Sequence, residues 1–236
     1  MIKIEDVEVM GMRKAIKGMR NAMNSWDKSD SGLSGCYEMI CDLCPYKSSD
    51  SFECDNKFHF IIGEKDMKLC KNLIKAGSPD RKFMRMIHVQ FDITAPETFL
   101  MQLDTYKVGT VSNSTSKMHT IHKRDLTVND FSHEHTPAEE FQPIVDRLNE
   151  LRSFYITSNN KAYWNALIEQ LPMSFMQRRT MDMNYETLFN IYHQRKHHKL
   201  NDWHTFCDWI ETLPYMKEFL GLDEQTEKGK ENDKEV

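Results

Sequence analysis

The sequence predicts an α+β protein, a single domain with an antiparallel or mixed sheet and a helix-rich C-terminal half. Apolar and polar residues alternate through much of 2–9 and 83–93, which is typical of half-buried strands. After residue 137, apolar residues recur at helical spacing. Hydrophobic residues make up 39% of the 236 residues, which is enough for a buried core and excludes a wholly disordered chain.

Glycine, proline and stretches of small polar residues bound the elements of the N-terminal half. Gly77 is a typical helix stop, and Pro96 ends the second strand and opens a short helix. Residues 105–117 are small and polar and carry no helical stripe. The expected elements are a strand at 2–9, a helix at 11–24, a long loop at 25–55, a helix at 64–76, a strand at 83–93 and a helix at 97–103.

The C-terminal half is expected to contain four helices and a tail. Leu171-Pro172 and Leu213-Pro214 mark helix ends or kinks, because proline lacks the amide hydrogen that a helix interior requires. Residues 223–236 have almost no apolar side chain and are expected to be disordered. The expected helices cover 143–157, 161–171, 184–198 and 202–220.

Charge and hydropathy exclude several classes of partner. With 31 Lys and Arg against 36 Asp and Glu, the net charge of −5 argues against bulk binding to duplex nucleic acid. No apolar run approaches the ~18–20 residues that a membrane helix needs, so no membrane association is expected. The first six residues carry acids where a signal peptide has a basic start, and we therefore expect a cytoplasmic protein.

Four of the six cysteines lie close together in the expected loop at 25–55. Two of them form a C-x2-C pair, a spacing that can supply one edge of a tetrahedral zinc site. Because no second tight pair follows, three interpretations stay open: free thiols, a structural zinc ion and a redox pair. The candidate zinc ligands are Cys36, Cys41, Cys44 and Cys54.

Two polar segments are candidates for nucleotide recognition. From Gln102 to Lys117 the chain carries hydroxyls, an amide and lysines, which can surround a phosphate or form an ordinary surface loop. The expected helix at 184–198 contains Asn184 and Asn190, and mid-helix asparagine is a poor helix former. These amides are either partly exposed or recognise a heterocycle, with Arg195 binding a phosphate.

Basic residues surround the histidines of the same helix. His193 and His197 lie one turn apart, as metal-binding pairs do, but the glutamate of an H-E-x-x-H site is missing. The neighbouring Arg195, Lys196 and Lys199 suit an anion better than a metal cation. A plain solvated face is the remaining alternative.

The two segments resemble, in this order, the flavin-dependent thymidylate synthases. The family signature is written R-H-R-x7-S and follows an A-P-x5-Q stretch, which residues 95–102 match without a gap. Residues 105–107, Thr-Tyr-Lys, stand where R-H-R is expected. Thr115 stands in place of the Ser, and Lys117-Met118 in place of a following R-Y pair.

The likeness extends through most of residues 10–215. Residues 19–23 resemble an N-terminal A-A-R helix, and Leu171-Pro172 resembles the L-P before the family's final strand. Asn184, Asn190 and Arg195 match an N-x-R-x-L-x-N…R helix, in which Glu186 replaces the first Arg. The family's G-H-x-S-x-x-E-H flavin segment is represented only by Gly77-Ser78, without its histidines and glutamate.

The resemblance implies a domain at 1–222 with a cysteine-containing insertion at about 27–57, followed by the tail at 223–236. It implies a homotetrameric methyltransferase of dTMP biosynthesis that binds FAD and a pyrimidine nucleotide such as dUMP. NADPH and methylene-tetrahydrofolate are the implied co-substrates, and a one-carbon unit is transferred to C5 of the base. The implied nucleotide-binding residues are Gln102, Lys107, Thr115, Lys117 and Arg195, and the implied flavin-binding residues are Ser78, Asn184 and Asn190.

Two alternatives follow from the departures. A relative that has lost catalysis could keep the fold and bind a nucleotide or a partner protein. A zinc-stabilised interaction module is the other alternative, and it is compatible with either of the first two interpretations.

Overall fold

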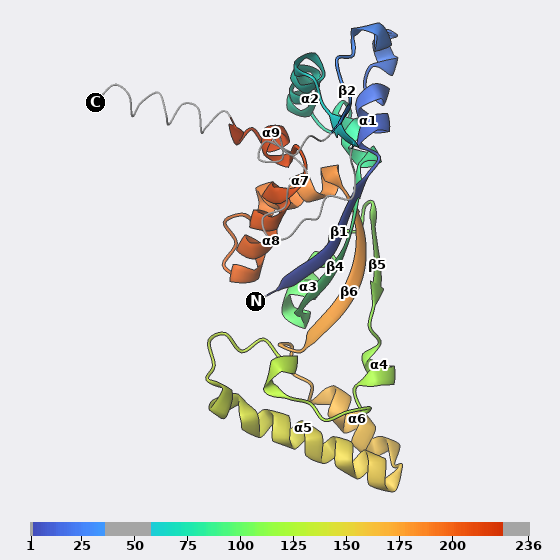
Figure 1. Ribbon diagram of the computed structural model, residues 1–236. Coiled ribbons are helices and arrows are strands. Elements are labelled where there is room, and N and C mark those ends of the chain that lie inside the picture. Colours follow the sequence, from blue (N-terminus) through green and yellow to red (C-terminus); the bar gives the residue numbers. More distant parts are fainter. Residues whose placement is uncertain (1, 36–57, 224–236) are drawn as a thin grey trace, which may run out of the picture. The chain divides into compact units, whose positions relative to one another are not determined.

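The computed structural model describes residues 2–35 and 58–223 (Figure 1). In chain order, the strands and α-helices are β1 (Lys3–Met10), α1 (Met12–Gly18), β2 (Gly32–Gly35), β3 (Phe58–Ile61), α2 (Glu64–Ala76), β4 (His88–Pro96), α3 (Glu97–Leu103), β5 (Thr110–Ser114), α4 (Lys117–Thr120), α5 (Ala138–Ser158), α6 (Lys161–Glu169), β6 (Met176–Asn184), α7 (Tyr185–Arg195), α8 (Asn201–Thr212) and α9 (Met216–Leu220). The short 3-10 helices are η1 (Asn21–Met23), η2 (Trp26–Lys28), η4 (Arg81–Met86) and η5 (Val128–Asp130).

The strands of the described residues form two sheets. A four-stranded sheet has the order β1-β4-β6-β5. A separate antiparallel pair, β2-β3, places Gly32 opposite Ile61 and Gly35 opposite Phe58. The predicted α+β class is thereby confirmed.

The chain divides into two compact units, which are described separately below. The first unit comprises Met1–Val7, Phe91–Lys107 and Val111–Met181. The second unit comprises Glu8–Gln90, Val108–Thr110 and Asp182–Val236. The domain limits implied by the resemblance, 1–222 with a tail at 223–236, stay a prediction, and residues 224–236 lie outside the described part.

A helical hairpin forms one core of the first unit. Helices α5 and α6 lie side by side in Figure 1 and bury apolar side chains between them. Phe131 packs against Phe141 and Phe175, with ring centroids 5.2 and 5.7 Å apart. The cluster is formed by Ile121, Leu126, Phe131, Phe141, Val145, Leu148, Leu151 and Leu167.

Helix α7 lies at the centre of the second unit. It contacts both η4 and α8, and it buries most of its first seven side chains. Tyr185 is fully buried and donates its hydroxyl to the carbonyl of Pro214 at 2.9 Å. Trp203 of α8 is also fully buried. The candidate site described below is therefore fixed to a packed helix.

Several predicted elements are confirmed, and others need correction. The helices expected at 64–76 and 97–103 have the predicted bounds. The strand expected at 83–93 begins only at His88. Phe83 and Met84 are adjacent and both buried, whereas successive side chains of a half-exposed strand point to opposite faces, so these two residues lie in η4. The expected helix at 202–220 is two helices, since Pro214 interrupts it.

The residue pattern predicted no strand between the expected helices at 161–171 and 184–198, where β6 lies; only the resemblance placed a strand after Leu171-Pro172. This strand carries Arg178, Arg179 and Thr180, so it lacks clean alternation. Its residue Gln177 is buried and donates its side-chain amide to the carbonyl of Thr115 at 2.8 Å. Polar residues of this strand thus form hydrogen bonds with residues far away in the sequence, which a local pattern does not reveal.

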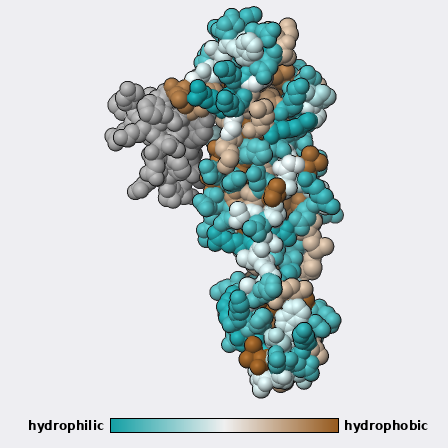
Figure 2. Space-filling model, turned by 90° about the vertical axis from the view of Figure 1, so that its right-hand side faces the viewer, coloured by the Kyte–Doolittle hydropathy of each residue, from teal (hydrophilic) through white to brown (hydrophobic). Residues whose placement is uncertain are grey.

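Hydrophilic residues cover most of the face shown in Figure 2, and the most strongly hydrophobic residues on it lie apart from one another. Among the helices of the described residues, none has the length and hydropathy required to cross a bilayer. The candidate zinc ligands Cys36, Cys41, Cys44 and Cys54 fall outside the described residues, so the zinc hypothesis stays a prediction. The described cysteines, Cys70 and Cys207, are buried thiols, and burial raises the pKa of each to about 12.

Candidate functional site

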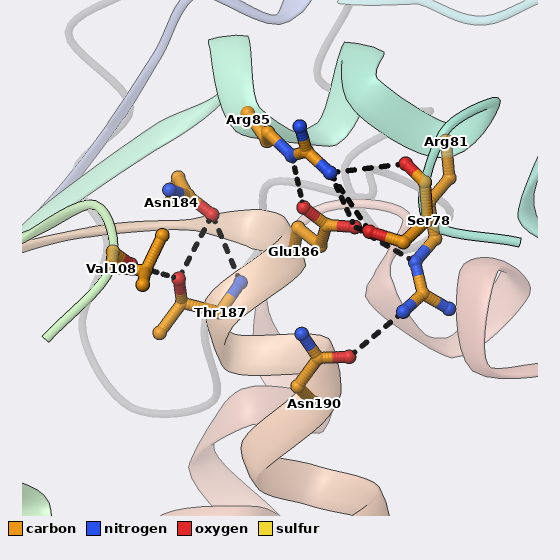
Figure 3. A network of polar contacts seen from close by, with 8 residues as sticks. All are labelled: Ser78, Arg81, Arg85, Val108, Asn184, Glu186, Thr187 and Asn190. Carbon is orange, nitrogen blue, oxygen red and sulfur yellow. Dashed lines mark hydrogen bonds and ion pairs between the residues drawn. The ribbon is translucent and has the colours of Figure 1, made fainter. Parts of the chain in front are cut away.

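The amino end of α7 carries a dense group of polar side chains (Figure 3). Asn184 is the N-cap: its Oδ1 atom accepts the backbone amide of Thr187 at 2.9 Å. The hydroxyl of Thr187 lies 2.8 Å from the carbonyl of Val108 and donates to it. The cap therefore links α7 to the loop that precedes β5.

Gly109 makes this approach of loop and helix sterically feasible. Its φ of +67° lies in the left-handed region, which favours glycine. A Cβ atom at this position would lie 2.0 Å from Nδ2 of Asn184, far inside van der Waals contact. Both the backbone conformation and the neighbouring amide thus require glycine here.

We expect the Gly109→Ala variant to be less stable by about 2 kcal/mol, because the added methyl group clashes with Asn184 and strains the backbone. Urea unfolding followed by circular dichroism measures the change. Gly32→Ala is the matched control, since a Cβ there meets no atom within 4 Å. Equal stability of the two variants would contradict the prediction.

Glu186, two residues after the cap, is held by residues that precede β4. Its Oε1 atom accepts hydrogen bonds from Ser78 Oγ at 2.8 Å and from Arg81 Nε at 3.0 Å. Its Oε2 atom forms an ion pair with Arg85. Arg81 also donates to Oδ1 of Asn190 at 3.0 Å, so two residues of α7 that lie one turn apart are joined to η4 and the turn before it.

The electrostatics of this group favour an ionised carboxylate. Burial alone would raise the pKa of Glu186, but hydrogen bonds from Arg85, Ser78 and Arg81 outweigh it and hold the pKa below the ordinary value. The side chain of Glu186 is 9% exposed, whereas that of Arg85 is 47% exposed. Two guanidinium groups against one carboxylate leave a local charge of +1 on a partly accessible surface.

The structure brings the three predicted flavin-binding residues to one region of the second unit. Ser78 donates to Glu186, and Asn190 accepts from Arg81, which also binds Glu186 (Figure 3). Asn184 caps the helix that carries Glu186 and Asn190. Arg81 and Arg85 were missed from the sequence, although they are one helical turn apart and follow Ser78 closely. Their partner Glu186 is 101 to 105 positions away, which no local pattern reveals.

Arg195 lies at the other end of α7. Its guanidinium lies over the ring of Trp203, with Cζ 4.9 Å from the ring centroid. Burial lowers the pKa values of the nearby His193 and His198. Nearby cations lower them further: Lys196 acts on His193, and Arg195 acts on His198. Among the described residues no group of three or more metal-ligand side chains is found, and the anion interpretation of this basic segment, like that of a plain solvated face, stays a prediction.

The four remaining predicted nucleotide-binding residues lie in the first unit. Thr115 donates its hydroxyl to the carbonyl of Arg178 at 3.1 Å, and Lys117 forms a 2.8 Å ion pair with Glu97. Gln102 is half-buried near the end of α3, and Lys107 is exposed in the loop that follows it. These side chains thus lie on α3, in the loop after it, between β5 and α4, and on α4.

Comparison with known proteins identifies the fold. No family model matches the chain, and no curated protein matches it in sequence. Its structure is similar to a crystal structure of thymidylate synthase X from Helicobacter pylori with FAD and dUMP, with a TM-score of 0.65 and 15% identity over 93% of this chain and 97% of that one. A second structure of the flavin-dependent enzyme from Helicobacter pylori, also with FAD and dUMP, gives a TM-score of 0.64 at 15% identity, over 92% of this chain and 97% of that one. At this identity the likeness establishes the fold alone.

Proposed function

We propose that this protein is a divergent flavin-dependent thymidylate synthase-like enzyme that transfers a one-carbon unit to C5 of a pyrimidine nucleotide such as dUMP. The gathering of Ser78, Asn184 and Asn190 around the amino end of α7, together with Arg81 and Arg85, carries the proposal. The similar enzymes from Helicobacter pylori, crystallised with FAD and dUMP, support it at the level of the fold. NADPH and methylene-tetrahydrofolate are proposed as co-substrates, and a homotetramer in the cytoplasm as the working form.

The donor set around Glu186 fits a phosphate-bearing cofactor. Arg81 and Arg85 against Glu186 leave a local charge of +1. Nε and Nη2 of both arginines already bind protein acceptors, so each arginine would offer Nη1 to a phosphate oxygen. Asn190 accepts from Arg81 through Oδ1, which leaves its amide hydrogens available to a ligand. FAD bound there by Arg81, Arg85 and Asn190 would supply the redox chemistry of the transfer.

The chain's own residues would bind and orient the nucleotide. Arg195, fixed on Trp203, offers a guanidinium for the phosphate group. In the first unit, Lys107, Lys117 and the Thr115 hydroxyl are proposed as further nucleotide-binding residues, with Gln102 hydrogen-bonding the base or sugar. Lysine provides a point charge rather than a planar fork, so phosphate binding through Lys107 is expected to be weaker than through arginine.

Arg195→Ala is expected to weaken dUMP binding by about 10- to 100-fold, because a charge-assisted hydrogen bond contributes roughly 1.5–3 kcal/mol. Isothermal titration calorimetry measures the change. Arg147→Ala, which removes an exposed arginine on α5, is the control and should leave the affinity unchanged. Equal affinities in the two variants would contradict a role for Arg195 in nucleotide binding.

The visible spectrum of the protein, with and without added FAD and dUMP, tests the proposed cofactor. A protein with flavin absorbance whose spectrum shifts on addition of dUMP would support the proposal. A colourless protein that takes up no FAD but still binds dUMP would favour the non-catalytic relative. A protein that binds neither FAD nor dUMP would overturn the proposed enzyme and would leave, of the non-catalytic alternatives, only the relative that binds a partner protein.

A further inference from the structure

A pocket of about 300 Å³ lies in the second unit, and none of the residues assigned above to the nucleotide or flavin lines it. Helix α1 contributes two cations, and η2, β3 and the segment before β2 contribute two aromatic rings and two hydroxyl groups. Its volume is at the lower end of the range of small-molecule sites. The lining residues are Arg13, Lys17, Trp26, Ser29, Ser31 and Phe60.

The polar floor of this pocket is held in place by a buried ion pair. Asp66 is fully buried and accepts Nε of Arg20 at 2.5 Å through Oδ1. Its Oδ2 atom accepts the hydroxyls of Ser29 and Ser31 at 2.6 and 2.5 Å. The two serine hydroxyls therefore have fixed positions before any ligand arrives, which lowers the entropic cost of binding.

The neighbouring Asp30 attaches the same segment to the start of α2. Its Oδ2 atom accepts the backbone amide of Lys65 at 2.8 Å, and its Oδ1 atom accepts that of Asp66 at 3.1 Å. A Cβ atom at Gly63 would lie 2.3 Å from Cγ of Asp30, so only glycine allows this approach. Residues 29–31 are thus fixed to α2 by all three of their side chains.

The charge of the pocket is positive. None of the described residues that line it carries a carboxylate, and Asp66 beneath it is neutralised by Arg20. Among the described residues no acid forms an ion pair with Arg13 or Lys17, which are both exposed on the outer side of α1. An anion is therefore the ligand that these two side chains suit.

The aromatic lining points to a planar ligand. Trp26 is 46% exposed, and its indole Nε1 donates to Oδ1 of Asn21 at 2.7 Å, which fixes the plane of the ring. Phe60 contributes a second ring to the same pocket. Aromatic side chains stack on planar ligand rings, and an exposed tryptophan in a cationic pocket offers such a surface.

We propose that this pocket binds a small anion that carries a planar ring, with Arg13 and Lys17 holding the anionic group and Trp26 stacking on the ring. The ligand class is an aromatic or heteroaromatic phosphate or carboxylate no larger than a nucleoside monophosphate. Ser29 and Ser31 belong to the segment that the family resemblance treats as an insertion.

The experiment uses 1-naphthyl phosphate as the probe and measures its fluorescence on titration with the full-length protein. Inorganic phosphate and 1-naphthol serve as the two half-ligands, and each is expected to bind at least about tenfold more weakly than the probe. The double variant Arg13→Ala, Lys17→Ala is expected to weaken probe binding by about tenfold or more. Trp26→Ala is expected to weaken it by about fivefold.

Lys14→Ala is the matched control, because it removes an exposed cation of α1 that does not line the pocket. Arg195→Ala, measured in parallel, separates this site from the proposed nucleotide site and is expected to leave probe binding unchanged. Circular dichroism confirms that each variant is folded. Absence of probe binding to the wild type at 5 mM probe, or equal affinity in the double variant and Lys14→Ala, would overturn the proposal.

Discussion

Replacing Asp66 with alanine is expected to lower the free energy of unfolding by about 3–5 kcal/mol, the cost of leaving one member of a buried ion pair without its partner. Asp66 is fully buried, and the side chain of Arg20 is 6% exposed, so the guanidinium cannot regain water when the carboxylate is removed. The variant also loses the acceptor for Ser29 and Ser31. Urea unfolding monitored by circular dichroism measures the difference.

A double variant separates the effect of the unpaired charge from the contribution of the pair. Replacing a buried ion pair by apolar side chains of similar volume is often neutral or stabilising. Asp66→Leu combined with Arg20→Met should therefore recover part of the stability that Asp66→Ala loses. A loss below about 1 kcal/mol for Asp66→Ala alone would show that water reaches Arg20.

Glu186→Gln is expected to destabilise the protein by about 2–3 kcal/mol, because it removes charge-assisted hydrogen bonds from two arginines. The effect should be smaller than at Asp66, since the side chain of Arg85 is 47% exposed and partly screened by solvent. Asp208→Asn, an acid-to-amide change at an exposed position of α8, is the matched control and should alter stability by less than about 0.5 kcal/mol. Urea unfolding at pH 7 gives both values.

The difference in free energy of unfolding between the wild type and Glu186→Gln should decrease as the pH is lowered. The pKa of Glu186 in the folded state is lowered relative to its ordinary value of 4.5, so folding favours the ionised form. This stabilisation is fully present above the pKa of the unfolded chain and is lost as the pH falls below it toward the folded-state pKa. The difference should therefore be constant between pH 6 and 8 and shrink below about pH 4.5, and a difference that grows on acidification would contradict this assignment.

The elements that were predicted with correct bounds carry their signals locally. Helix α2 has an apolar stripe, acids in its first turn and Gly77 after its last residue. Helix α3 follows Pro96 directly and is equally well bounded. Strands β5 and β6 could not be predicted from the residue pattern, because their polar residues find partners only in the folded protein. Asp92 of β4, for example, forms an ion pair with Arg178 of β6.

The candidate site was predicted only in part, because some of its residues meet their partners only in the folded protein. Asn184 and Asn190 stood out because asparagine is unfavourable inside a helix, but only Asn190 lies inside α7, whereas Asn184 is its N-cap, a position that favours asparagine. Arg81 and Arg85 did not stand out, since their role depends on Glu186 more than a hundred positions away. A local pattern can show that a residue is unusual, but only the fold shows which charge it meets.

The first turn of α2 is completed by a residue that lies far from it in the chain. Asp30 accepts the amide of Lys65 across 35 positions, while Gly63, the N-cap residue just before the helix, has no side chain to do so. The helix start and the segment that lines the cationic pocket are therefore held to each other by the same side chain. Protection of the Lys65 amide hydrogen from exchange with solvent would accordingly report that this segment is in place on α2.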